Sequence, residues 1–152
     1  MSQPTKSKDE IKKLKEIEKL QTSRDYANGL RISTKLVKNY PKSAEALAWK
    51  AYFTYMKAQG EKPKDEVLQM QRSAIQLDMK SAQAWRTSAL LFKEMQDYEN
   101  ALKCSNMSLR NNPNDITTLN DIANLNLYSK NYSEFLKNTR AIFEKNPNNF
   151  SI

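Results

Sequence analysis

The stretch that decides the fold runs from Ser81 to Pro113 and reads SAQAWRTSALLFKEMQDYENALKCSNMSLRNNP. Trp85 near its start is followed four positions later by Ala89, and the pair Asp97-Tyr98 separates a first half from a second. The second half carries the small residues Ala101, Ser105 and Ser108, and Pro113 ends it. Large and small residues at these spacings predict two helices whose backbones pack closely, the second of them stopped by proline.

The same spacing recurs along the chain. Adding 34 to Trp85, Ala89, Tyr98 and Pro113 gives Leu119, Ala123, Tyr132 and Pro147, and subtracting 72 from Tyr98 and Pro113 gives Tyr26 and Pro41. The value 72 corresponds to two repeats plus an insertion of four residues, which we place in the turn at 59–63. A helix-turn-helix unit that recurs about every 34 residues is typical of the tetratricopeptide repeat (TPR). The sequence therefore predicts an all-α fold, a right-handed α-solenoid of about four TPR units.

The predicted organisation is a disordered tail over residues 1–8 and a TPR array over 9–150. The repeats are expected at about 9–42, 43–80, 81–114 and 115–148, with helices near 9–22, 24–39, 44–58, 64–78, 82–95, 97–111, 115–129 and 132–145. Solenoids normally end in a polar capping helix. Here Ile142, Phe143, Phe150 and Ile152 stand near the end instead, so we expect the chain to be part of a longer array.

The predicted repeat core consists of the large and small residues at the repeating positions, namely Tyr26, Gly29, Trp85, Ala89, Tyr98, Ala101 and Tyr132. Gly29 falls where the facing helix is expected to approach most closely. The aromatic residues Trp49, Tyr52 and Tyr55 have two interpretations. They can fill the core, which aromatic residues at helical spacing usually do, or they can form a strip that binds peptides.

The composition excludes several classes of function. The chain has no histidine, one cysteine and two glycines, which removes His-based catalytic triads and the usual zinc sites. We expect no enzyme activity of its own, no metal and no cofactor. No apolar run is long enough to span a membrane and no secretory signal precedes the helices, so we expect a cytoplasmic protein without membrane contact.

Several groups of residues, taken in order, resemble one known family. They are Tyr26-x-x-Gly29-Leu30, Ala44-Glu45-x-Leu47-Ala48-x-Lys50, Asp78-x-Lys80-Ser81, Tyr98-x-x-Ala101-x-Lys103-Cys104, Asn114-Asp115, Leu119-x-Asp121-Ile122 and Thr139-Arg140. Their order and spacing resemble the N-terminal repeats of the auxiliary subunit of the N-terminal acetyltransferase A (NatA) complex, over about residues 11–147. The chain departs from that family in the longer turn at 59–63 and in Ala51, which stands where the family tends to have glycine.

The resemblance implies a non-catalytic scaffold. In that family the auxiliary subunit wraps the catalytic acetyltransferase subunit, mainly through later repeats, and holds it at the ribosome. The complex acetylates the α-amine of nascent chains from acetyl-CoA. The expected partners are therefore the catalytic subunit and the ribosome with its RNA, and not DNA.

The basic residues of the first two expected helices are the best candidates for ribosome contact. Residues 1–40 hold ten Lys and Arg against five Asp and Glu, a net charge of +5 out of +8 for the chain. Such a surface can bind RNA phosphates by releasing counterions. The candidates are Lys12, Lys13, Lys15, Lys19, Arg24, Arg31 and Lys35. The alternative interpretation is a solvated face with i,i+4 pairs such as Lys12 with Glu16.

A second class of function is a chaperone-associated TPR adaptor that binds peptide carboxylates. A Lys-x-x-x-Asn pair on the first helix of a repeat is typical of such adaptors, and the expected first helices carry none. Asn120 and Asn124 could clamp a peptide backbone or simply face solvent. Asp121 could pair with a nearby Arg or Lys, and Cys104 is expected to be an unreactive buried thiol.

Overall fold

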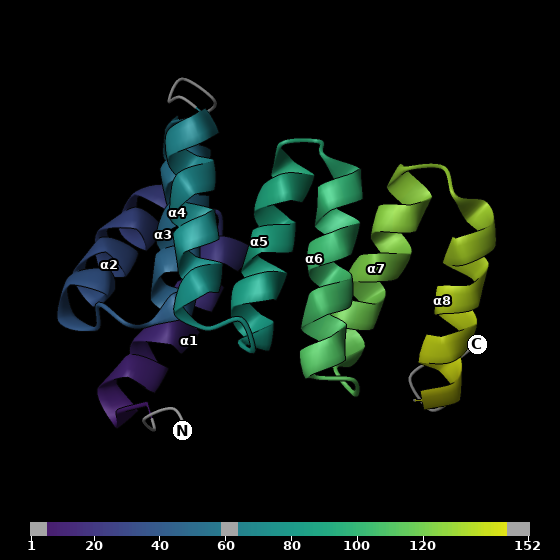
Figure 1. Cartoon of the computed structure of the whole chain (residues 1–152), viewed down its shortest axis with the longest axis horizontal. Coiled ribbons are helices and arrows are strands. Elements are labelled where there is room, and N and C mark those ends of the chain that lie inside the picture. The colour runs from purple at the N-terminus through teal and green to yellow at the C-terminus, as the bar shows by residue number, and fades with distance from the viewer. Residues whose placement is uncertain (1–5, 59–63, 146–152) are drawn as a thin grey trace. The chain divides into compact units, whose positions relative to one another are not determined.

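The computed structural model describes residues 6–58 and 64–145, and these residues form eight α-helices and no strand (Figure 1). The helices are α1 (Lys8–Thr22), α2 (Tyr26–Asn39), α3 (Ala44–Ala58), α4 (Lys64–Leu77), α5 (Ala82–Glu94), α6 (Tyr98–Asn111), α7 (Ile116–Tyr128) and α8 (Tyr132–Lys145). Each expected helix is present, and its ends lie within two residues of the prediction. The all-α fold class is therefore confirmed. The insertion at 59–63 and the residues Pro147, Phe150 and Ile152 lie outside the described residues.

The turn between the two helices has the same backbone geometry in three of the hairpins. Arg24, Gln96 and Lys130 all have a positive φ of about 60°, and the amide of the following residue donates to a carbonyl five residues back. These bonds are Asp25 to Leu20 at 3.0 Å, Asp97 to Phe92 at 2.9 Å and Asn131 to Asn126 at 2.7 Å. This pattern is the Schellman motif, which ends a helix and satisfies its last carbonyls.

The helix starts repeat as well. Asp25 and Asp97 cap α2 and α6, and each also accepts a bond of 2.7 Å from the side chain of an asparagine three residues later. Ser7 caps α1 through the amide of Glu10 at 3.1 Å. The expected tail over residues 1–8 is therefore too long, because Ser7 and Lys8 already belong to the start of α1. A serine followed three residues later by glutamate is a sequence signal for such a cap.

The chain divides into two compact units, residues 1–79 with α1–α4 and residues 80–152 with α5–α8. In the first unit the core lies on α3, whose Trp49, Tyr52 and Phe53 are each at most 1% exposed. Their rings contact one another with centroids 5.2–5.7 Å apart. The structure thus places Trp49 and Tyr52 in the core, and Tyr55 is only partly buried.

Gly29 lies where α2 meets this aromatic cluster. A Cβ added to Gly29 would lie 2.3 Å from Cε1 of Phe53 on α3. Real Cβ atoms do not come this close to other atoms, so only glycine fits unless the ring moves. This is the close helix approach that the position of Gly29 in the repeat predicts.

In the second unit, buried residues lie on all four helices, and one core cluster lies between α7 and α8, where Leu119, Ala123 and Ile142 pack together. Two polar contacts join neighbouring helices. The Ser108 hydroxyl on α6 donates to the carbonyl of Ala82 at 2.8 Å, and the Asn126 amide on α7 donates to Asn138 on α8 at 2.8 Å. These bonds join α5 to α6 and α7 to α8.

The predicted core residues divide into three groups. Gly29, Ala89 and Ala101 are buried, and Tyr26, Tyr98 and Trp85 are only partly buried. Tyr132 is 58% exposed, so its assignment to the core is wrong. The reason lies in its counterparts: Tyr26 contacts Tyr52 and Phe53 on α3, and Tyr98 stacks on Tyr128 of α7. A tyrosine at this position contacts the first helix of the next hairpin, and the described residues contain no helix after α8.

Candidate functional site

The predicted basic residues lie on α1, on α2 and in the turn between them. Lys12, Lys15 and Lys19 follow one another at spacings of three and four residues, which places them on one face of α1. All three are exposed, while the buried Leu14 and Ile17 define the opposite face. Arg24, Arg31 and Lys35 are also exposed, and Lys13 is partly buried.

Few of these cations are neutralised within the part of the chain that the structure describes. Lys13 pairs with Glu16 at 3.5 Å, and Arg31 donates to the Asn28 side chain at 3.5 Å rather than to a carboxylate. Between described residues, Glu16 pairs with Lys13 and not with Lys12, the example pair of the alternative interpretation. The name basic face refers to these seven predicted residues of α1, α2 and the turn between them, namely Lys12, Lys13, Lys15, Lys19, Arg24, Arg31 and Lys35.

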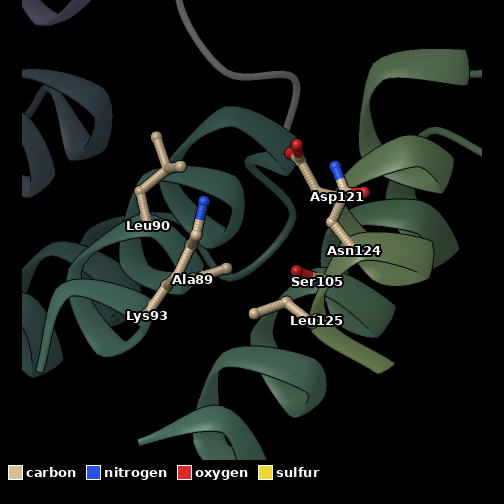
Figure 2. Close-up of a pocket in the computed structure, with 7 residues that line it drawn as sticks. All are labelled: Ala89, Leu90, Lys93, Ser105, Asp121, Asn124 and Leu125. Atoms are coloured by element: carbon tan, nitrogen blue, oxygen red, sulfur yellow. The ribbon is translucent and has the colours of Figure 1, made fainter. Parts of the chain in front are cut away.

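A small pocket with an enclosed volume of about 20 Å³ lies within the second unit, between α5, α6 and α7 (Figure 2). It is lined by Ala89, Leu90 and Lys93 of α5, by Ser105 of α6, and by Asp121, Asn124 and Leu125 of α7. The lining combines a cation, a carboxylate, an amide and a hydroxyl with short apolar side chains. An enclosed space of this size has room for about one water molecule beside these groups.

The carboxylate of the pocket is already paired. Arg86 Nε donates to Asp121 Oδ2 at 3.0 Å, and both side chains are about one quarter exposed. Burial raises the pKa of Asp121 above its usual range, and the neighbouring Arg86 lowers it only in part. The nearby Asp115 is also occupied, because it caps α7 and accepts from the Thr118 hydroxyl at 2.7 Å. The structure thus gives Asp121 the partner role that the sequence left open.

The cation of the pocket has a different environment. Lys93 Nζ lies 5.3 Å from the centre of the Tyr128 ring, and Tyr128 in turn stacks on Tyr98 with ring centroids 6.0 Å apart. Within residues 6–58 and 64–145, no carboxylate lies within ion-pair distance of Lys93. The tyrosine face therefore contacts the ammonium, and Lys93 also lies close enough to Asp121 to lower the pKa of its carboxyl.

Two uncharged polar groups complete the lining. Ser105 is 1% exposed, and its hydroxyl has no hydrogen-bond partner among the described residues. A buried hydroxyl without a partner is costly, by about 1–3 kcal/mol. Asn124 is exposed, as is Asn120 one turn before it, whereas Asn126 is buried and bonded.

Cys104 lies outside this pocket's lining and has no features of a nucleophile. It is buried, and burial together with the charge of Asp97 raises its thiol pKa to about 12. The thiolate is therefore absent at neutral pH.

Sequence reasoning singled out Asn120, Asp121 and Asn124 but missed Lys93 and Ser105. A signal was available, because residues about one repeat apart lie on adjacent first helices. Arg86 and Asp121 are 35 positions apart, and Lys93 and Tyr128 are also 35 apart. The same offset therefore brings both cations of α5 against α7.

None of the described helices is long and apolar enough to cross a membrane.

Comparisons with known proteins agree with the fold and with the resemblance. No family model matches the chain. The auxiliary subunit NAA15 of the N-terminal acetyltransferase A complex from Arabidopsis thaliana is 25% identical over 126 residues, which cover 83% of this chain and 14% of that protein. The chain thus spans about one seventh of the length of this curated relative.

Two solved structures have a similar fold. One is a chain of the structure of Naa15/Naa10 bound to HypK-THB, with a TM-score of 0.76 and 21% identity, covering 91% of this chain and 20% of that one. The other is YrrB, described as a TPR protein with an unusual peptide-binding site, with a TM-score of 0.57 and 15% identity, covering 92% of this chain and 71% of that one. At these identities the likeness concerns the fold.

The recurring helix caps, the recurring turns and these comparisons lead to one conclusion. The chain is an all-α array of TPR hairpins, and its sequence resembles the auxiliary subunit of the N-terminal acetyltransferase A complex, as the motifs between Tyr26 and Arg140 indicate.

Proposed function

We propose that this chain is a non-catalytic TPR scaffold of the kind found in the auxiliary subunit of a NatA-type N-terminal acetyltransferase. The observation that carries the proposal is the similarity to NAA15 over most of the chain. In this role the chain acts in the cytoplasm and helps to hold a catalytic acetyltransferase subunit at the ribosome. The similarity of its fold to a chain of the Naa15/Naa10 structure supports a partner of that kind.

The basic face supplies the ribosome contact in this proposal. Its lysines and arginines are mostly exposed and mostly lack carboxylate partners among the described residues. Exposed cations on a rigid helix pair can bind RNA phosphates with little dependence on base sequence, since each contact releases a counterion. The second unit has a nearly balanced charge, with eight Lys and Arg against seven Asp and Glu over residues 81–152.

Ribosome co-sedimentation tests this proposal. Replacing Lys12, Lys13, Lys15 and Lys19 by Glu should abolish binding and leave the helix content unchanged. A control variant replaces Lys64, Lys103, Lys130 and Lys137 by Glu, all of them exposed and outside the basic face. Both variants bring the formal charge of the chain from +8 to zero. The proposal requires loss in the first variant and retention in the second, and equal loss in both variants contradicts it.

A peptide-binding adaptor is the second candidate function. The pocket between α5, α6 and α7 favours it, because Lys93 and Asn124 line that pocket from two neighbouring first helices. The described first helices carry no Lys-x-x-x-Asn pair, as the sequence analysis predicts, so the chaperone-associated form of this function lacks its motif.

A further inference from the structure

We propose that the pocket between α5, α6 and α7 is a binding site for one internal water molecule. This water accepts a hydrogen bond from the Ser105 hydroxyl of α6 and donates one to the Asp121 carboxylate of α7, so it joins the α5–α6 hairpin to the α7–α8 hairpin. The site lies wholly within the second unit, and it depends neither on the scaffold role nor on ribosome contact.

The Ser105 hydroxyl differs from its counterparts in two other hairpins. Ser33, 72 positions earlier, and Thr139, 34 positions later, have the same place in their repeats. The Ser33 hydroxyl donates to the carbonyl of Leu30 at 3.2 Å, and the Thr139 hydroxyl donates to the carbonyl of Phe135 at 2.9 Å. Both are satisfied by their own helix, whereas the hydroxyl of Ser105, which is 1% exposed, has no such bond among the described residues. It therefore needs a partner from outside α6.

The pocket beside Ser105 has the size and the lining that a single water molecule requires. Its enclosed volume is about 20 Å³, and a cavity needs about 10–15 Å³ of such volume to hold one water. A buried water also needs about two to four polar partners. Figure 2 shows the side chains of Lys93, Asp121 and Asn124 around the space beside the Ser105 hydroxyl. The lining thus offers a water the hydrogen bonds that an apolar cavity lacks.

Asp121 supplies the acceptor on α7. Arg86 Nε donates to Oδ2 of this carboxylate at 3.0 Å, and no bond to its Oδ1 is present within residues 6–58 and 64–145. A carboxylate accepts up to about four hydrogen bonds, so Asp121 can bind the water and Arg86 together. The water then extends the Arg86–Asp121 pair, which joins α5 to α7, to the Ser105 hydroxyl on α6. Lys93 and Asn124 carry N–H donors for the second lone pair of the water.

A crystal structure of the full chain, at a resolution that shows ordered water, tests the site directly. We expect a density peak within about 2.5–3.2 Å of Ser105 Oγ and of one Asp121 carboxylate oxygen, the distances of ordinary hydrogen bonds. Ser33 is the control in the same map, because its hydroxyl should bond the carbonyl of Leu30 and not a water. This measurement needs no variant, so it stands even if a substitution in the pocket prevents folding.

Urea titrations of variants test the same bond in solution. Ser105→Ala removes a hydrogen-bonded hydroxyl, so it should raise the unfolding equilibrium constant about fivefold. Removing a hydroxyl without any partner has the opposite sign, because it relieves a desolvation cost. In an Asp121→Ala background the bridge is already broken, and Ser105→Ala should change the constant by less than about twofold. Ser33→Ala is the matched control, and its effect should be the same in both backgrounds.

Specific results overturn the proposal. A map without a peak beside Ser105, or with its hydroxyl bonded to a carbonyl of α6 as that of Ser33 is, shows that the pocket does not bind water in this way. A peak that bonds Ser105 but not Asp121 removes the bridge to α7. A Ser105→Ala variant more stable than the unaltered chain shows a hydroxyl without a partner, and an equal effect in both backgrounds shows a bond that does not involve Asp121. None of these results bears on ribosome co-sedimentation.

Discussion

Replacing Gly29 by alanine tests how tightly the hairpins of the first unit pack. In most helix interiors this change stabilises a protein, by about 0.5–1 kcal/mol, because glycine loses more backbone entropy on folding. Here the new Cβ meets the Phe53 ring at 2.3–2.5 Å. Phe53 is fully buried and contacts the rings of Tyr26, Trp49 and Tyr52, so it cannot move aside without disturbing the whole cluster.

The size of the effect follows from the helix-forming gain of alanine and the opposing cost of the clash with the Phe53 ring. Overpacking a well-packed core costs about 1–3 kcal/mol, and a ring enclosed by three others should lie toward the upper end of this range. After the helix gain is subtracted, Gly29→Ala should destabilise the chain by about 1–2 kcal/mol. For a chain of this size that corresponds to a melting temperature lower by about 2–8 °C.

The measurement is a thermal melt followed by circular dichroism at 222 nm, with a second pair of proteins as control. In a Phe53→Leu background the ring is gone, so adding Gly29→Ala should cost much less than it does in the unaltered chain. The reasoning fails if Gly29→Ala raises the melting temperature in the unaltered chain, or if its effect is the same in both backgrounds.

Three further outcomes are expected, each with its own measurement. Trp49→Ala should lower the free energy of unfolding by about 3–5 kcal/mol. The loss should be larger than for Trp85→Ala, since Trp49 is 1% exposed and Trp85 is only partly buried. Equal losses of unfolding free energy in urea titrations would contradict this ranking. Cys104, with its thiol pKa raised to about 12, should react with iodoacetamide at pH 8 far more slowly in the native chain than in denaturant, and similar rates would show that the thiol is accessible. Asp121 has a raised pKa in the folded chain, so the folded state binds the proton of its carboxyl more tightly than the unfolded state does. The stability that protonated Asp121 contributes is therefore lost as the pH rises from about 3.8, the usual pKa of Asp, through the raised pKa of the folded chain. The Asp121→Asn variant should lack this fall, so its curve of unfolding free energy against pH should differ in shape from that of the unaltered chain. Superimposable curves would refute the assignment.

The repeat period made the fold readable from the sequence, because three of the hairpins repeat the same turn geometry and two of them the same aspartate cap. Asp25 and Asp97, 72 positions apart, cap their helices in the same way and bind an asparagine three residues later. Such local signals depend on neighbours in the chain, so they can be read without knowing the tertiary structure. The close approach at Gly29 follows from the same register.

Burial at the edges of a hairpin could not be read in this way. Tyr132 has the same place in its repeat as Tyr26 and Tyr98, yet it is exposed, because the contact that buries this position comes from the next hairpin. Trp85 resembles a core anchor by size, whereas the fully buried tryptophan is Trp49. The repeat pattern specifies which face a residue lies on, and the neighbouring helix decides how far that face is covered.

The candidate sites differ in the same respect. The basic face depends only on the sequence of the first two helices, and its charge excess is visible in residues 1–40. The pocket needs Lys93, Ser105 and Asn124, which come from three different helices and share no motif. Only the offset of about one repeat between α5 and α7 connects them along the chain.

The most direct test of the scaffold proposal is the salt dependence of ribosome binding by the full chain. If the basic face binds RNA phosphates, the logarithm of the binding constant falls steeply and linearly with the logarithm of salt concentration. Each phosphate contact contributes about 0.7–0.9 to the slope, so replacing Lys12, Lys15 and Lys19 by Gln should reduce the slope by about 2–3. A shallow slope that is unchanged in this variant would contradict the proposal.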